Sequence, residues 1–341
     1  MSNKYSQEPV LKTIANRKGM KVTIMDWGAT IISIKVPVPD EDPREMLLGL
    51  KDPADWASQA CFFNATIGRY ANRIAGSAFK AGGRICTLNS GAKHCLHGGV
   101  EGFDKRRFEF IDEQPNALAL KLNSPDGDMG FPGNFELTVK YEITSDNELR
   151  ISYSAVCDQV CPVCITNHAY FNLNGRHSSV LGHKLWMDAK AYLPCDADSI
   201  PTGEVRLVRG GAFDFTTPKT IGRDFMKDEQ MKDPTGYDHP YLIEGCICKP
   251  FLRAESEDGK VKLEFRTDYP AFQFYSGNYV NSNGSAIPAR DDGKIYENQT
   301  AFCCEPEFYP DSPHLPQFAQ SNPMAGPDRP FCRRIFYKFI V

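Results

Sequence analysis

Apolar and polar residues alternate along much of the chain, which is the period-two pattern of half-buried β-strands. The pattern is clear at 21–36, 118–122, 135–143, 149–156, 261–266 and 336–341. Segments rich in Gly, Pro, Asn and Asp separate these runs, such as 124–134, and indicate turns. Many strands at short spacing predict an all-β protein with the architecture of a large antiparallel β-sandwich.

Helical periodicity is scarce, and the best candidate for a helix is a short segment at 223–231. A length of 341 residues would suit about two domains, but large all-β folds often exceed ~200 residues as one domain. The sequence contains no internal repeat, low-complexity tract or obvious linker. We therefore expect a single domain over 1–341, with long loops such as 41–58 forming the rim of an active site.

Two of the predicted strand segments, 167–173 and 272–277, carry polar residues at alternate positions. The residues that would share the polar faces are His168, Tyr170 and Asn172 in the first segment, and Gln273 and Tyr275 in the second. Several such faces on one sheet would form a shallow groove lined with hydrogen-bonding groups. The alternative is that these faces simply meet solvent, as in most antiparallel sheets.

The composition is that of an ordinary globular protein, with 41% hydrophobic and 24% charged residues. A net charge of -4 argues against a nucleic-acid-binding protein, which normally carries a basic excess on one face. No segment reaches the ~18 apolar residues of a membrane span, and the first residues do not resemble a signal peptide. We therefore expect a cytoplasmic protein, with no nucleic-acid or membrane partner, whose twelve cysteines are reduced thiols.

Motifs for metals and nucleotides are weak. The pair Cys161 and Cys164, followed by His168, could be a redox or zinc site, but the flanking βαβ pattern and a second ligand pair are missing. The acidic segment 126–130 lacks the remaining ligands of a calcium loop. Neither a G-x-G-x-x-G nor a P-loop sequence occurs. We therefore expect neither a bound metal nor a cofactor.

Six short blocks carry the residues best suited to chemistry. They lie at 68–74, 96–99, 167–173, 237–242, 272–278 and 304–314, and the candidates taken from them are one Arg, two His, one Asp, one Gln and one Glu. An imidazole and a carboxylate can act as general acid and base. The other groups can hold hydroxyls. This set of side chains suits proton transfer on a neutral, polyhydroxylated substrate.

These blocks resemble the galactose mutarotase (aldose 1-epimerase) family. The resemblance continues through 27–37, 102–105, 188–204 and 213–222, in order and over nearly the whole chain. It implies the β-sandwich of the mutarotase superfamily, often termed a supersandwich, and a cytosolic enzyme without a cofactor. It also implies the reaction, which is interconversion of the α and β anomers of an aldohexose. D-galactose and D-glucose are the expected small-molecule substrates, and a monomer or weak homodimer is the expected assembly.

The resemblance also implies roles for individual residues. Glu305 matches the general base of the family and His168 its general acid. The residues that match those holding the sugar are Asn72, Arg73, His97, Asp238 and Gln273. Glu307 would share a strand face with Glu305 and is a rival for the role of base.

Three alternatives stay open. A hexose-6-phosphate 1-epimerase on the same fold would need further basic residues for the phosphate. A non-catalytic sugar-binding protein would need neither Glu305 nor His168. A thiol or zinc protein would use Cys161 and Cys164.

Overall fold

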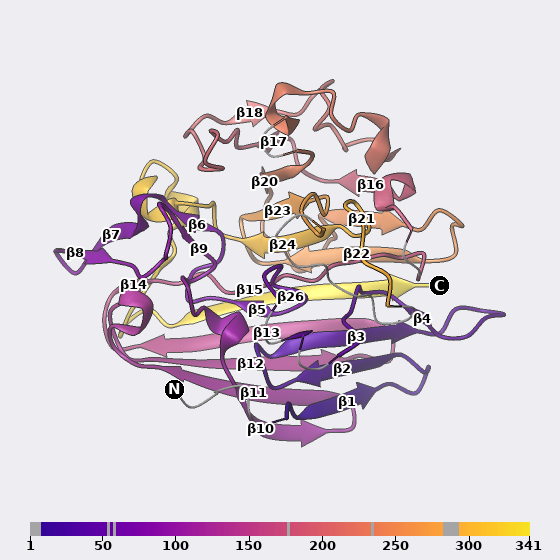
Figure 1. Ribbon diagram of the computed structural model, residues 1–341, viewed down its shortest axis with the longest axis horizontal. Coiled ribbons are helices and arrows are strands. Elements are labelled where there is room, and N and C mark those ends of the chain that lie inside the picture. The colour runs from indigo at the N-terminus through magenta and orange to yellow at the C-terminus, as the bar shows by residue number, and fades with distance from the viewer. Residues whose placement is uncertain (1–7, 53–54, 57–58, 176–177, 233–234, 282–292) are drawn as a thin grey trace.

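The computed structural model describes residues 8–52, 55–56, 59–175, 178–232, 235–281 and 293–341, and within them antiparallel strands dominate (Figure 1). The largest sheet has nine strands. In spatial order they are β10 (Glu109–Gln114), β11 (Ala117–Ser124), β12 (Phe135–Ile143), β13 (Glu148–Cys157), β26 (Phe331–Ile340), β22 (Lys262–Thr267), β21 (Leu252–Glu255), β16 (Lys184–Met187) and β19 (Lys219–Thr220). The late strand β26 therefore lies between β13 and β22, inside the sheet (Figure 1).

Two smaller sheets complete the main layers. One contains β1 (Leu11–Ala15), β2 (Lys21–Met25), β3 (Thr30–Val36) and β4 (Arg44–Glu45). The other has five strands in the order β18 (Arg206–Leu207), β17 (Ala191–Tyr192), β20 (Asp238–Leu242), β23 (Ala271–Tyr275) and β24 (Cys303–Glu307). The alternating pattern at 21–36 therefore forms two strands, because a turn with left-handed residues at Gly28 and Ala29 separates β2 from β3.

Short strand pairs and 3-10 turns connect these sheets. The pairs are β5 (Thr66–Ile67) with β15 (Thr166–Asn167), β6 (Arg73–Ile74) with β9 (Cys95–Leu96), β7 (Ala78–Ala81) with β8 (Arg84–Thr87), and β14 (Cys161–Pro162) with β25 (Met324–Ala325). The 3-10 turns are η1 (Ala75–Ser77), η2 (Phe103–Lys105), η3 (Asp128–Gly130), η4 (Val180–Gly182), η5 (Ile221–Arg223), η6 (Glu229–Met231), η7 (Ser312–His314) and η8 (Ala319–Ser321).

The helix predicted at 223–231 is wrong. This segment holds the end of η5 and the whole of η6, and Met226 between them has a left-handed φ of 64°. A left-handed residue cannot continue a right-handed helix, so the periodic apolar residues lie in two separate turns. The part of the chain that the structure describes contains no helix with the length and hydropathy of a transmembrane span.

Alternation along the strands explains the core. In β12 every second residue, from Phe135 to Ile143, is buried, as the period-two pattern predicts. The same buried cluster joins β2, β3, β13, β22 and β26, and extends from Ile14 to Phe339. That continuity agrees with a single domain over 1–341, which stays a prediction.

Candidate active site

A cavity of about 380 Å³ lies beside the strands β20, β23 and β24. It is lined by Ala60, Cys61, Phe62, Asn72, Arg73, Leu96, His97, His168, Tyr170, Ser199, Asp238, Gln273, Tyr275, Tyr279 and Glu305. All seven residues that the sequence singled out for catalysis or sugar binding are among them. The volume is within the usual range for a small-molecule site.

Strand register brings together the cavity side chains that come from β20, β23 and β24. Gln273 on β23 pairs with Glu305 on β24, and Asp238 on β20 pairs with Tyr275. The Gln273 side chain donates a hydrogen bond from Nε2 to Asp238 Oδ1 at 2.7 Å. Its neighbours Phe272 and Phe274 point into the core, so the predicted alternation along this strand is confirmed.

The segment 167–173 differs from its prediction, because it is not one continuous strand. β15 ends at Asn167, and Phe171 forms an isolated bridge. His168 and Tyr170 line the cavity, as expected. Asn172 does not, because its buried amide donates to backbone carbonyls of Thr300 and Ser178, at 2.7 and 2.8 Å. A buried amide needs such partners, and here they lie away from the cavity.

His97 is held in one tautomer by the backbone. Its Nδ1 accepts a hydrogen bond from the Asn72 backbone N–H at 3.2 Å, so the neutral ring carries its proton on Nε2. His97 and the two glycines after it all have positive φ. Gly98 is required there, since a Cβ at that position would lie 2.0 Å from the Gly68 carbonyl oxygen. The turn thus presents an N–H donor to the cavity.

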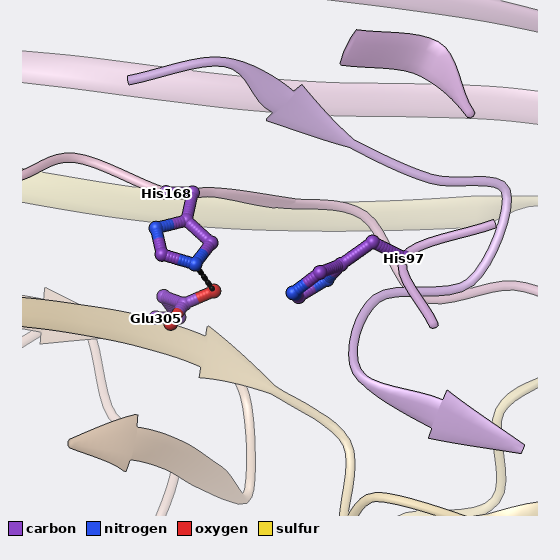
Figure 2. A group of neighbouring side chains, drawn as sticks. All are labelled: His97, His168 and Glu305. Carbon is purple, nitrogen blue, oxygen red and sulfur yellow. Dashed lines mark ion pairs between the residues drawn. The ribbon is translucent and has the colours of Figure 1, made fainter. Parts of the chain in front are cut away.

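Glu305 and His168 form the central pair of the site. Glu305 Oε2 lies 3.6 Å from His168 Nε2, and the two residues are only 3% and 6% exposed (Figure 2). Burial raises the pKa of Glu305 well above its usual value, and nearby Glu307 and Asp238 add to the effect. Burial also lowers the pKa of His168 to about 4. Burial therefore disfavours the charged form of both residues.

His97, His168 and Glu305 could also hold a metal ion by geometry, since one ligand atom of each lies within 4.8 Å of the others (Figure 2). The sequence did not suggest this cluster, because the three residues come from blocks far apart in the chain. The tautomer of His97 disfavours it. A metal at Nε2 would move the ring proton to Nδ1, where it would face the Asn72 N–H. Absence of a metal stays a prediction.

Arg73 is the one cationic side chain among the described residues that line the cavity, whereas Asp238 and Glu305 are acidic. Burial raises the pKa of Asp238, and the nearby Arg73 lowers it by a smaller amount. The cavity therefore offers several hydrogen-bond donors and acceptors, but little positive charge for an anionic group.

Phe62 lines the cavity and has no motif signal in the sequence. Its ring centroid lies 4.6 Å from that of His97 and 6.1 Å from that of His168. A ring of this kind gives an apolar surface to the C–H face of a ligand. Phe62 has a left-handed φ of 57°, which sequence periodicity could not reveal.

The prediction that 41–58 forms the rim of the active site is wrong for the described residues of this segment, because none of them lines the cavity. Residues 60–62 line the cavity, whereas 41–45 border a different hollow. Arg44 holds that segment away from the site through a hydrogen bond from Nη2 to Asp258 Oδ2 at 2.7 Å. Positions 53–54 and 57–58 lie outside the described residues.

The cysteine alternative finds no support. Cys161 and Cys164 are buried free thiols and do not line the cavity. The Cys164 sulfur accepts a hydrogen bond from the Phe308 backbone N–H at 3.4 Å. In the described part of the chain, neither cysteine belongs to a group of three potential metal ligands.

Comparison with known proteins identifies the family. The family model described as "Aldose 1-epimerase" matches residues 11–323. The curated Aldose 1-epimerase of Escherichia coli K12 is 42% identical over 334 residues, covering 97% of this chain and 95% of the relative. The Galactose mutarotase of Homo sapiens is 33% identical over 326 residues, covering 94% and 92%.

Solved structures agree with the fold. The GalM/aldose epimerase homologue from C. elegans superposes with a TM-score of 0.88 at 28% identity, covering 97% of this chain and 99% of that one. Galactose 1-epimerase from Lactobacillus acidophilus gives a TM-score of 0.84 at 29% identity, covering 100% and 97%. The predicted mutarotase-like antiparallel β-sandwich is therefore confirmed.

Proposed function

Because the chain belongs to the aldose 1-epimerase family, we propose that it interconverts the α and β anomers of aldohexoses, with D-galactose and D-glucose as substrates. It is an isomerase. The observation that carries the proposal is the buried pair Glu305 and His168, which faces a cavity lined with hydrogen-bonding groups. A protein that only binds sugar has no need of such a pair, which disfavours the non-catalytic alternative.

Glu305 and His168 have the chemistry that ring opening requires. Glu305 takes the proton from the C1 hydroxyl while His168 gives a proton to the ring oxygen, and the ring opens to the aldehyde. C1 then turns about the C1–C2 bond. On closure, His168 removes the proton from the ring hydroxyl and Glu305 returns one to O1.

The remaining lining residues hold the sugar. Arg73 and Asp238 make charge-assisted hydrogen bonds to hydroxyls away from C1, and Gln273 orients Asp238. His97 donates from Nε2. Asn72 acts mainly on its neighbours, because its amide nitrogen already donates to Glu307 and its amide oxygen accepts from the Arg73 N–H.

Neutral sugars are the better substrates. A hexose 6-phosphate brings two negative charges near neutral pH, and Arg73 is the only cation among the described lining residues, beside Asp238 and Glu305. Burying a phosphate without matching cations would cost binding free energy. We therefore rank the hexose-6-phosphate 1-epimerase alternative second.

Polarimetry tests the proposal directly. Optical rotation of freshly dissolved α-D-galactose and α-D-glucose should relax faster with the protein than in buffer, and EDTA should leave the rate unchanged. Galactose 6-phosphate and glucose 6-phosphate should relax more slowly than the neutral sugars. Relaxation at the buffer rate across all the hexoses would refute the activity, and loss of activity in EDTA would revive the metal site at His97, His168 and Glu305.

Changing Asp238 to Asn tests the sugar-holding role. Loss of the charged acceptor typically costs about 1–3 kcal/mol in a desolvated hydrogen bond, so the KM for galactose should rise at least several-fold. Asp112→Asn removes the same charge from an exposed position on β10 and should leave KM unchanged. An Asp238→Asn enzyme with wild-type KM and kcat would place Asp238 outside the sugar site.

We further infer a cytoplasmic enzyme, since all twelve cysteines are free thiols. A monomer or weak homodimer is the proposed assembly, because the site is complete within one chain. Light scattering during size-exclusion chromatography would check it.

A further inference from the structure

A second buried carboxyl group lies behind the wall of the cavity. Glu307 is on β24, is 0% exposed and does not line the cavity. Its Oε1 accepts a hydrogen bond from Asn72 Nδ2 at 2.9 Å. Its Oε2 has no hydrogen-bond partner within the described residues. A buried carboxyl group with one oxygen unsatisfied destabilises the fold, which suggests that it has a role in the site.

The hydrogen bond from Asn72 connects Glu307 to the sugar-holding residues. Asn72 has a left-handed φ of 60°, and its amide oxygen accepts from the Arg73 backbone N–H at 2.9 Å. The Asn72 backbone N–H donates to Nδ1 of the His97 ring, and the Asn72 carbonyl accepts a hydrogen bond from the His97 backbone N–H. The Asn72 side chain therefore fixes the backbone from which both Arg73 and His97 reach the cavity.

Glu307 also interacts electrostatically with Glu305. Residues two apart on a strand share a face and are separated by about 6.5 Å. At that distance two buried carboxylates repel each other. Glu307 is accordingly one cause of the raised pKa of Glu305, after burial itself.

Few other groups around Glu307 titrate in the working pH range. The charged or titratable groups that interact electrostatically with it are Glu305, Asp238, Arg73, Tyr70, Cys164 and Cys195. Burial raises the pKa values of the tyrosine and of both thiols, so these three stay neutral. Below pH 7 the relevant carboxyl groups are the two glutamates and Asp238.

We propose that Glu307 is a positioning residue of the reaction, which holds Asn72 in place and sets a second buried carboxyl group beside Glu305. The inference rests on the proposed function, since it gives Glu307 a part in the same proton transfer. Burial raises the pKa of Glu307 as well as that of Glu305, so the two carboxyl groups lose their protons as a coupled pair. Once Glu307 is ionised, repulsion makes Glu305 keep its proton up to a higher pH. Acidification therefore removes the base form, and with it the activity, at a higher pH than Glu305 alone would show.

Two conservative variants separate the two effects. Glu307→Gln keeps an oxygen that can accept from Asn72 but removes the charge. On acidification kcat/KM falls as the base is protonated, and this fall is the acid limb of the pH profile. The acid limb should move to lower pH by about one pH unit, and KM near neutrality should stay unchanged. Glu307→Asp keeps the charge but shortens the side chain, so Asn72 loses its partner. KM should rise several-fold while the acid limb moves far less.

The surface variant Glu109→Gln, on exposed β10, controls for the loss of one negative charge and should leave the acid limb unmoved. An acid limb of Glu307→Gln that coincides with that of the wild type would overturn the electrostatic role. A Glu307→Asp enzyme with wild-type KM would overturn the positioning of Asn72. A wild-type protein without mutarotation would refute the proposed function itself, whereas these two results with an active wild type refute only this inference.

Discussion

Glu305→Gln is expected to lower kcat by roughly two to four powers of ten, which is the usual contribution of a general base. Glutamine has the shape of glutamate and still reaches the C1 hydroxyl, but it cannot accept a proton. Binding should survive in part, because we propose that Arg73 and Asp238 hold the far hydroxyls of the sugar. The measurement is the polarimetric rate for galactose at saturating and subsaturating concentrations, which gives kcat and KM separately.

Glu109→Gln, at the surface of β10, is the matched control for Glu305→Gln and should keep full turnover. Circular dichroism of both variants checks that the fold is intact. If Glu305→Gln kept near-wild-type kcat, Glu305 would not be the base, and Glu307, two residues further along β24, would be the next carboxyl group to test.

His168→Asn should lower kcat by a similar two to four powers of ten, because it loses the ring nitrogen that we propose as the proton donor to the ring oxygen. The His168 ring also stacks on Tyr170, with centroids 5.0 Å apart, so the melting temperature must be measured beside the rate. A folded variant with a low kcat and a modest change in KM would support the acid role. A rise in KM alone would instead make His168 a binding residue.

The double variant Glu305→Gln, His168→Asn gives a further check on the pair. Residues that act as one unit lose function non-additively, so the double variant should be little slower than either single one. Multiplicative losses in kcat would show that the two side chains act in independent steps, which would contradict a coupled proton transfer across the 3.6 Å between them.

Much of this site could be predicted because its strands are regular. Alternation put Gln273 and Tyr275 on one face, and the structure places both at the cavity. The motif residues Glu305 and His168, 137 positions apart, meet because β15 and β24 lie close together, which only the resemblance could anticipate.

The failures have one physical origin, which is local conformation that departs from the strand or helix period. Met226 and Phe62 both have left-handed φ, so one ends a predicted helix and the other brings an unexpected ring into the cavity. Asn172 follows an irregular segment and turns away from the site. The bond between Asn72 and Glu307 joins positions 235 residues apart, and nothing in either local sequence signals it.

The place of β26 within the nine-stranded sheet has a consequence for synthesis of the protein. Its partners β13 and β22 are made much earlier, yet each has an unpaired edge until 331–340 is available. On the ribosome, the largest sheet therefore cannot close until these last strand residues have left the exit tunnel. Until then the nascent chain exposes two strand edges able to pair with other chains, so final folding and protection from aggregation both depend on this one late strand.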